Sequence, residues 1–433
     1  MEDHSITRSS EKTANQPENS TPSEVEDSNS KAQKTLSIDN ASIHTDEYDK
    51  AYIMGFVHNP TNSSVNEIRI LVNIFNDNGE ILESKRTSTF LSNLFTGQSS
   101  PFSTIIETNP NEISGFKCSL EGFQVSEIET INVQILRESL TEGIDENVYL
   151  AGEIYNHHSK PIIIETVAAG LFNKEGYLLS SSKASKFIHY LDPGEVGPFQ
   201  VTLPKYHSQD SIATNFQTYI EAQVSTPKPY FNLDMSNIST LHDEDTGIFH
   251  LAGEIINAAN QSLTVSLMAG IYDEQGFLID VSITSLPFPI FSRETLPFSF
   301  TNWQVLNSDN RYQESAMNYS IQWDPQLTMP ILNEYVHLKT INDQIINNLS
   351  NIVLTGSIHN DTKNPVRDIA IIGVIYDPES GLIRSVNVQE IASILHNNQS
   401  ADYYMVIDAY DVPSQIDDNV VITAKGKVIS QQQ

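Results

Sequence analysis

The strongest constraint on this chain is a short sequence motif that occurs four times. Each copy places an apolar residue two positions before a glycine, a second apolar residue two positions after it, and an asparagine four positions after it. The copies are 53–59, 150–156, 251–257 and 354–360. The motif glycines are Gly55, Gly152, Gly253 and Gly356, and the asparagines are Asn59, Asn156, Asn257 and Asn360. The glycines lie 97, 101 and 103 residues apart, which indicates four related units in tandem.

A second glycine follows each motif at a nearly constant distance. These glycines are Gly79, Gly176, Gly276 and Gly381, which lie 24, 24, 23 and 25 residues after the motif glycine. In each unit an aromatic residue comes first, then polar residues, then the glycine. This order predicts a strand that runs into a tight turn, where glycine supplies a positive φ.

The first motif has the period of a β-strand. Side chains alternate between the two faces of a strand, so the two apolar residues and the glycine share the inward face. We expect the glycine to leave room for a large residue from the opposing sheet or for close backbone approach. The asparagine falls where the strand should end, and its side chain can hydrogen-bond the local backbone there.

A third landmark completes the unit. Pro-Phe occurs at 101–102, 198–199 and 297–298, and the fourth unit has Asp-Tyr at 402–403. Each unit closes on an apolar strand, at 116–125, 219–224, 319–323 and 420–428, and each opens with an extended stretch, of which 131–136 is the clearest. No segment shows a helical period of helical length. Six or seven strands in about 100 residues are typical of a Greek-key sandwich.

The sequence therefore predicts an all-β protein of four tandem immunoglobulin-like antiparallel β-sandwich domains behind a disordered tail. The boundaries are 1–34 for the tail, 35–127 for repeat 1, 128–228 for repeat 2, 229–327 for repeat 3 and 328–433 for repeat 4. The tail is polar and has almost no large apolar residue, so it cannot offset its ordering entropy by burial. Prolines in the linker 225–229 predict stiff joints between repeats.

Composition narrows the classes of function. Acidic residues outnumber basic ones 55 to 24, for a formal net charge of −31, which argues against nucleic acid and anionic membranes as partners. No apolar stretch reaches the roughly 18–20 residues of a membrane helix, and the opening residues are acidic and polar, so we expect neither a spanning segment nor a signal peptide. Cys118 is the only cysteine, which excludes an intrachain disulfide and predicts a structural thiol.

The three landmarks together resemble the FxLYD domain family, an immunoglobulin-like repeat of prokaryotic envelope proteins. Repeat 2 matches best, through the motif around Gly152, the turn at Gly176 and the segment 191–199. The other repeats depart from the family at the Pro-Gly turn, and repeat 4 also lacks Pro-Phe. The resemblance covers about 35–433 and implies a non-catalytic module on surface or secreted proteins. It supplies no catalytic residue.

No residue pattern predicts chemistry. The chain has no helical metal-ligand pair, no nucleophile elbow and no phosphate-binding glycine loop. His58 and His359 occupy one repeat position on the outward face of a strand, and 157–158 is a pair of histidines in a turn. The acidic segments 242–247 and 77–79 can bind calcium in principle, but both fall where ordinary turns are expected. We expect no enzyme, no cofactor and no catalytic, cofactor-binding or metal site.

Two functions fit these patterns. The first is a non-catalytic structural or protein-interaction array at the prokaryotic cell envelope or surface, which acts as a semi-rigid beaded rod. Its partners would be other envelope or surface proteins, with no nucleic acid and no direct membrane insertion. The alternative is an array of ligand-binding modules for carbohydrate or peptide. That alternative needs exposed aromatic platforms, whereas Trp303 and Trp323 are expected in the core or between domains.

Overall fold

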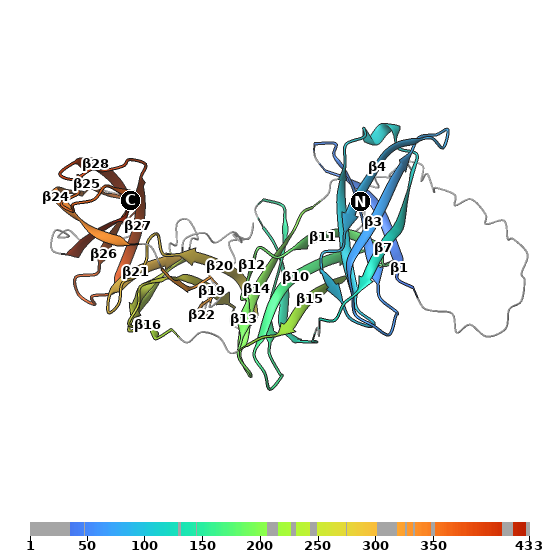
Figure 1. Cartoon of the computed structure of the whole chain (residues 1–433), viewed down its shortest axis with the longest axis horizontal. Coiled ribbons are helices and arrows are strands. Elements are labelled where there is room, and N and C mark those ends of the chain that lie inside the picture. The colour runs from blue at the N-terminus through green and yellow to red at the C-terminus, as the bar shows by residue number, and fades with distance from the viewer. Residues whose placement is uncertain are drawn as a thin grey trace, which may run out of the picture. The chain divides into compact units, whose positions relative to one another are not determined.

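The structure is a computed structural model of the whole chain, shown in Figure 1. It describes the residues 35–46, 48–128, 131–143, 145–205, 215–226, 231–242, 249–273, 275–300, 318–324, 327–331, 334–347, 351–408 and 419–429. The predicted disordered tail (1–34), the prolines of the linker 225–229, the acidic loop after His242 and Trp303 all lie outside these residues.

The chain is an all-β protein, as the sequence predicts. Among the described residues the regular elements are β-strands in antiparallel sheets, together with one short 3-10 helix, η1 (Pro110–Glu112). The strands form sandwich domains along the chain (Figure 1). Contacts divide the chain into two compact units. The first holds 1–127 with 172–179 and 206–215, and the second holds 128–171, 180–205 and 216–433.

Repeat 1 consists of two small sheets. Its strands are β1 (Ser37–Thr45), β2 (Ala51–His58), β3 (Val65–Phe75), β4 (Ile81–Ser88), β5 (Asn93–Leu94), β6 (Ser99–Ile106) and β7 (Gly115–Val125). One sheet has the order β1-β2-β6. In the other, β3 lies between β4 and β7 and also pairs with β5.

Repeat 2 has the same plan. Its strands are β8 (Gln134–Glu142), β9 (Val148–Tyr155), β10 (Ile162–Phe172), β11 (Leu178–Lys183), β12 (Lys186–Phe187), β13 (Tyr190–Leu191), β14 (Val196–Leu203) and β15 (Asn215–Val224). One sheet has the order β12-β14-β9-β8. The other has β11-β10-β13, with β15 paired to β10.

Repeat 3 follows with sheets of order β16-β17-β21 and β20-β19-β22. Its strands are β16 (Leu233–His242), β17 (Phe249–Asn257), β18 (Leu263–Thr264), β19 (Ser266–Tyr272), β20 (Leu278–Ser285), β21 (Thr295–Phe300) and β22 (Asn318–Trp323). The short strand β18 pairs with β23 (Met329–Pro330), which lies between repeats 3 and 4 in the sequence.

Repeat 4 links its two sheets through one long strand. Its strands are β24 (Tyr335–Asn347), β25 (Asn351–His359), β26 (Val366–Tyr376), β27 (Ile383–Ile391), β28 (Ser400–Asp408) and β29 (Val420–Val428). The start of β24 pairs with β29 and its later part pairs with β25. The order is therefore β27-β26-β29-β24-β25-β28.

The motif strand forms the centre of the first sheet in each repeat. In β2 the apolar residues on either side of Gly55, Ile53 and Val57, are completely buried. The equivalent residues of the other repeats are also completely buried, namely Leu150, Ile154, Leu251, Ile255, Leu354 and Ile358. Alternation of side chains along a strand thus places this face in the core of every sandwich.

The motif glycine makes room for an aromatic ring, but not one from the opposing sheet. Gly152 lies directly opposite Phe199 on the neighbouring strand β14 of its own sheet. A Cβ atom at Gly152 would lie 2.8 Å from that ring, so a side chain cannot be added without a shift. The equivalent pairs are Gly55 with Phe102, Gly253 with Phe298, and Gly356 with Tyr403. The room is therefore used by a ring from a neighbouring strand of the same sheet, and the alternative of close backbone approach also holds at Gly55, where an added Cβ would lie 3.0 Å from the Cα of Ala41.

The opening strand of repeat 2 also differs from its expected position. The sequence placed it at 131–136, whereas β8 runs from Gln134 to Glu142. A bulge interrupts its pairing with β9 between Leu136 and Ser139, and Arg137 at that bulge has a φ of 51°. A single extra residue shifts the alternation of side chains, so the period of two ends at Leu136 although the strand continues.

Candidate functional site

The motif asparagine is a completely buried hydrogen-bonding centre. In repeat 2 the side-chain amide of Asn156 donates to the carbonyls of Lys160 and Leu191, at 2.9 and 3.0 Å. Its side-chain oxygen accepts from the backbone N–H of His158 at 3.0 Å. The amide therefore ties the loop after β9 to a segment 35 residues further along the chain.

The same arrangement occurs in all four repeats. Each motif asparagine donates to a carbonyl four residues ahead and to one more than 30 residues ahead, and each is 0% exposed. The distant acceptors are Leu94, Leu191, Ile290 and Leu395. Because buried amides must be satisfied, these bonds fix the two loops at one end of each sandwich. The motif asparagines thus hold the fold together.

The second glycine of each repeat lies in the turn that precedes β4, β11, β20 or β27. Gly79, Gly176, Gly276 and Gly381 have φ values of 77°, 85°, 80° and 71°. An Asn or Asp side chain closes each turn. Asn173, for example, accepts from the N–H groups of Glu175 and Tyr177. The strand after this turn, with the turn itself, is called the hairpin edge below; the four strands are β4, β11, β20 and β27.

The outer surface of the motif sheet is called the joint face. It is formed by β1, β2 and β6 in repeat 1, and by the equivalent strands in the others. In the second unit, Ser139 on the joint face of repeat 2 donates to the carbonyl of Leu278 on the hairpin edge of repeat 3, at 2.5 Å. Ser239 of repeat 3 donates in the same way to the carbonyl of Ile383 in repeat 4. The repeats of this unit thus meet directly through equivalent surfaces.

The first unit contains the same contact. There, Ser42 of β1 donates to the carbonyl of Leu178 at 2.8 Å, and Asn40 donates to the carbonyl of Gly176 at 3.0 Å. Phe56 stacks on Phe172 with ring centroids 5.2 Å apart. Each of the three serines follows two residues after a bulge residue with positive φ, namely Asn40, Arg137 and Asn237. In all three repeats the bulge changes the direction of the following side chains, so that the serine points toward the next repeat.

Apolar packing accompanies these hydrogen bonds in the second unit. One hydrophobic cluster joins Tyr149 of repeat 2, the core of repeat 3, and Ala370, Ile372 and Val374 of repeat 4. A core that continues across domain boundaries opposes independent motion of the domains.

Buried polar groups specify the joint between repeats 2 and 3. Asp280, which is completely buried on the hairpin edge of repeat 3, accepts from the side chain of Gln200 at 2.6 Å. Lys186 of repeat 2 donates to Gln200 and to the carbonyl of Val281, at 3.0 and 2.6 Å. Burial lowers the pKa of Lys186, and the charge of Asp280 opposes that shift. The hydrogen bonds from Lys186 to Val281 and from Gln200 to Asp280 exist only while repeats 2 and 3 are in contact.

Tyr272 makes this joint sensitive to alkaline pH. Its hydroxyl donates to Glu153 of repeat 2 at 2.8 Å, and Arg137 lies 3.5 Å from the same carboxylate. Burial, together with the hydrogen bond to Glu153 and the charge of that residue, raises the pKa of Tyr272 from 10.0 to about 12.

We therefore expect the joint to weaken in alkali. The folded chain keeps the Tyr272 proton at pH values where the unfolded chain has lost it, so this contribution is complete below pH 10 and is lost as the pH rises toward 12. Hydrogen exchange of β9 and β19 across this range will show the loss. The variant Tyr272→Phe should lose this part of the pH dependence, and an unchanged profile in Tyr272→Phe would refute the assignment.

A buried lysine clamps the joint between repeats 3 and 4. Lys425 of β29 is 0% exposed, and its ammonium group lies 2.5 Å from the carboxylate of Glu294 and 2.9 Å from the carbonyl of Pro289. The rings of Phe288 and Phe291 lie 4.7 and 3.9 Å from the nitrogen. Burial lowers the pKa of Lys425, while its bond to Glu294 opposes the shift. Ammonium, carboxylate and aromatic faces together form a charged contact shielded from water.

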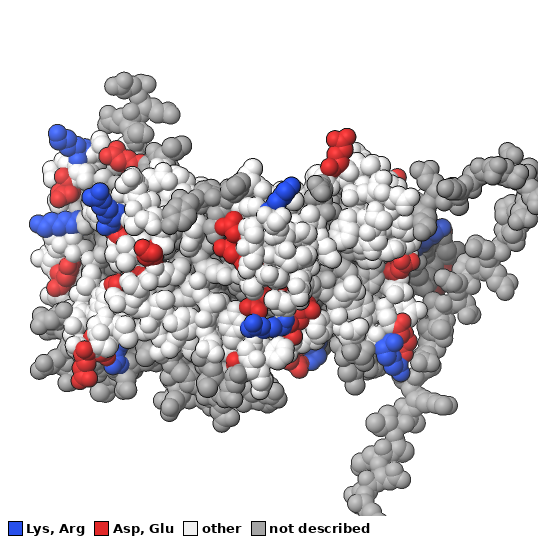
Figure 2. All heavy atoms as spheres, turned by 90° about the horizontal axis from the view of Figure 1, so that it is seen from below, with Lys and Arg blue, Asp and Glu red and all other residues white. Residues whose placement is uncertain are grey.

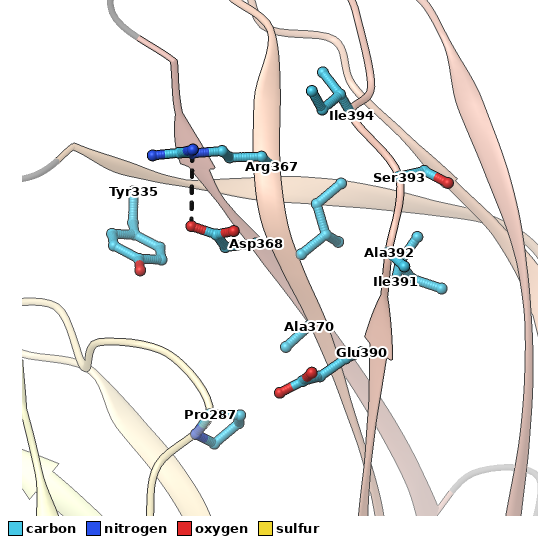
Figure 3. A pocket seen from close by; sticks show the side chains of 11 residues that line it. Pro287, Tyr335, Arg367, Asp368, Ala370, Glu390, Ile391, Ala392, Ser393 and Ile394 are labelled. Carbon is cyan, nitrogen blue, oxygen red and sulfur yellow. Dashed lines mark ion pairs between the residues drawn. The ribbon is translucent and has the colours of Figure 1, made fainter.

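A pocket of about 500 Å³ opens beside the same joint, between Pro287 of repeat 3 and a bulge on β26 (Figure 3). Arg367 and Asp368 lie at the bulge and form an ion pair at 3.7 Å, and the ring of Tyr335 on β24 also borders the pocket. The remaining lining residues are Ile369, Ala370, Glu390, Ile391, Ala392, Ser393 and Ile394. Both charges and an aromatic ring border this space, which suits a small polar ligand.

The histidines considered as metal ligands make other contacts. His58 and His359, which share a repeat position, hydrogen-bond Ser99 and Ser400, each at 3.0 Å. The rings of His157 and His158 are 4.3 Å apart, and His158 contacts the carbonyl of Asn132. The described residues contain no group of three or more His, Cys, Asp or Glu side chains that could hold a metal ion. Segment 77–79 is the tight turn after β3.

The single cysteine and one tryptophan lie in strands. Burial raises the pKa of Cys118 to about 11, which keeps the thiol protonated and unreactive at neutral pH. Trp323 packs beside Phe231, with ring centroids 5.8 Å apart, at the edge of the core of repeat 3.

Sequence reasoning missed the residues that form the joints. Gln200, Asp280 and Lys425 are polar residues within strands, and nothing in their local sequence marks them as buried. The serines carry a weaker signal, because they lie 13, 13 and 14 residues before the motif glycine, at 42, 139 and 239, and each pairs with the residue that precedes that glycine. Repeat 4 has Gln344 at this place.

Charged side chains are scattered over the face in Figure 2, where red and blue side chains, single or in small groups, lie among larger uncharged areas. None of the helices that the structure describes has the length and apolar character needed to cross a membrane.

Comparisons with known proteins identify no family. No family model matches the chain, and no curated protein matches it. Among solved structures, the chain is similar to the native conformation of alpha-2-macroglobulin from E. coli, at 10% identity and a TM-score of 0.12, over 90% of this chain and 28% of that one. The trypsin-activated form from Escherichia coli gives 11% identity and a TM-score of 0.12, over 89% and 29%. The chain thus spans less than a third of the proteins it matches.

Proposed function

We propose that this chain is a non-catalytic, semi-rigid array of sandwich repeats that acts as a structural or protein-interaction element. The observation that carries the proposal is the recurrent joint, in which a serine on one repeat bonds a hairpin carbonyl of the next. Direct contacts with buried polar groups and a shared apolar cluster resist bending between repeats. Such an array holds surfaces at fixed spacing.

The prokaryotic cell envelope or surface is the proposed place of action, with other envelope or surface proteins as partners. The support for this is the resemblance of the repeat landmarks to FxLYD domains. Fractionation of native cells with an antibody to this chain tests the location. Detection in the envelope or culture medium would agree with it, and detection in the cytosol alone would contradict it.

The joints themselves predict a cooperative array. The double variant Ser139→Ala with Ser239→Ala removes the hydroxyl donor from two joints. Each lost hydrogen bond contributes about 1 kcal/mol to the stability of its joint. We expect repeats 2, 3 and 4 to unfold together in the unmodified chain and closer to independently in the double variant, as followed by hydrogen exchange of each repeat in denaturant.

A serine outside the two joints that link repeats 2, 3 and 4 is the matched control. The hydroxyl of Ser182 bonds the carbonyl of the next residue, so Ser182→Ala should leave the coupling unchanged. Independent unfolding of the three repeats in the unmodified chain would contradict the semi-rigid array.

A ligand-binding array is the second candidate, and the pocket beside Arg367 and Tyr335 favours it. Short peptides and oligosaccharides are the classes to screen, by chemical-shift changes at Tyr335. Loss of those changes in Arg367→Ala would support a ligand site there, and no response to either class would contradict it.

A further inference from the structure

Every repeat carries both halves of the joint, a joint face and a hairpin edge. Three pairs of halves are engaged, through Ser42, Ser139 and Ser239. Among the four repeats that the structure describes, the hairpin edge of repeat 1 and the joint face of repeat 4 are the two halves that these contacts do not use.

The hairpin edge of repeat 1 is exposed where the others are buried. Ile81, two residues after the turn glycine, is 58% exposed. The equivalent residues Leu178, Leu278 and Ile383 are 0%, 0% and 1% exposed. Leu82, the next residue, is also exposed. Exposed apolar side chains on a strand edge are a template for association.

The joint face of repeat 4 shows the complementary exposure. Tyr404 lies opposite Thr355 on β25 and is 61% exposed. Its equivalent in repeat 2 is Gln200, which lies opposite Ala151 and is buried in the joint. An aromatic ring in this position offers apolar contact area at a low cost in entropy.

Both free surfaces carry charged side chains. The hairpin edge of repeat 1 carries Lys85 and Arg86 beside Glu80 and Glu83, and Arg86 forms an ion pair with Glu121 at 2.8 Å. The joint face of repeat 4 carries Asp402, which is exposed beside Tyr404. The joint between repeats 2 and 3 also contains charged groups on both surfaces, because Lys186 of the joint face bonds Gln200, and Asp280 of the hairpin edge accepts from the same glutamine.

We propose that the hairpin edge of repeat 1 in one copy docks on the joint face of repeat 4 in a second copy, which extends the array head to tail. The inference rests on the proposed function, because it reuses the joint that makes the array semi-rigid. The contact is heterologous, so it leaves a free surface at each end and does not close on itself. It is weaker than an internal joint, because Gln344 replaces the serine and because no linker supplies an effective concentration of millimolar order.

Sedimentation velocity of the full chain, from micromolar to millimolar concentration, is the test. We expect the mean mass to rise steadily with concentration and not to stop at the dimer. Ile81→Glu and Tyr404→Glu should each hold the protein as a monomer. A mixture of the two variants restores one good contact, so it should form dimers and nothing larger.

Controls separate this contact from general stickiness. Tyr48→Glu in repeat 1 and Ile394→Glu in repeat 4 replace residues that are 74% and 53% exposed and lie outside the two surfaces, and both variants should associate like the unmodified chain. Leu82→Glu and Thr355→Glu provide a second pair if either first variant loses its β-sheet circular dichroism. A chain that stays monomeric throughout, control variants that also block association, or two variants that fail to complement each other would overturn the proposal. None of these outcomes would contradict the proposed function, because the joints within one chain are tested separately by the variant Ser139→Ala with Ser239→Ala.

Discussion

Replacing Asn156 by alanine is expected to destabilise repeat 2 by about 3 kcal/mol, since a buried group left without its partner costs roughly 1–3 kcal/mol. The substitution removes the donors to the carbonyls of Lys160 and Leu191 and the acceptor for the N–H of His158. The asparagine is completely buried, so water cannot replace these bonds without opening the loops. Hydrogen exchange of peptides from β9 and β13 measures the loss repeat by repeat.

A second asparagine of the same repeat is the matched control. Asn173 accepts two backbone N–H groups in the exposed turn before Gly176, where water can take its place. We expect Asn173→Ala to cost less than 1 kcal/mol, as is usual for exposed substitutions. Equal losses for Asn156→Ala and Asn173→Ala would show that the buried asparagine does not hold the loops.

The isosteric variant Asn156→Asp tests the direction of the hydrogen bonds. An ionised carboxylate cannot donate to the two carbonyls, so the folded state should favour the protonated acid and raise its pKa. The deficit should therefore be smallest at acidic pH and should grow as the pH rises above the ordinary aspartate value of about 3.9. A deficit independent of pH would mean that the carboxylate has moved into water.

Much of the fold could be predicted from the sequence, because repetition makes weak local signals add up. One Gly-x-apolar-x-Asn segment is uninformative, but four copies with a second glycine at a fixed distance define strand, turn and repeat length together. Burial of Ile53 and Val57 on one face follows from the period of two, which needs no knowledge of the partner strand.

The contacts that could not be predicted from the sequence are those that depend on pairing between distant segments. The ring over Gly152 belongs to Phe199, and that contact follows from the register of β9 with β14. The bond of Asn156 to Leu191 spans 35 residues for the same reason. Register is set by the whole sheet and its turns, so no local window contains it.

The joints were harder still to predict, because they require the relation between two domains. A strand lysine such as Lys425 has the same sequence appearance whether it faces water or the next domain. Bulges at Arg137 and Asn237 direct the serines out of their sheets, and these bulges also ended the regular alternation on which strand prediction depends. The bulges therefore position the serines that form the joints, and they also interrupt the sequence pattern from which these strands would be predicted.

Replacing Lys425 by alanine is expected to uncouple repeats 3 and 4 at a cost of about 4 kcal/mol, the usual size for breaking one side of a buried ion pair. Glu294 would be left in a mostly buried site without its cation, and Phe288 and Phe291 would lose the ammonium group. Distances between spin labels on repeats 3 and 4 should broaden, and hydrogen exchange in β21 and β29 should accelerate. The exposed ion pair of Lys205 with Glu142 is the control, and its removal should change little.

The double variant Lys425→Met with Glu294→Gln separates loss of an ion pair from loss of packing. Methionine keeps the apolar stem against the two rings, and glutamine keeps an acceptor for the N–H of Phe291, which now bonds Glu294 at 2.6 Å. Most of the coupling should return, because no unpaired charge is left in the joint. Burial lowers the pKa of Lys425 below its ordinary 10.5, so the unfolded state binds more protons between the two values and stability rises with pH there. That rise should vanish in the double variant. A double variant as loose as Lys425→Ala would show that the charge itself, and not the filled volume, sets the joint.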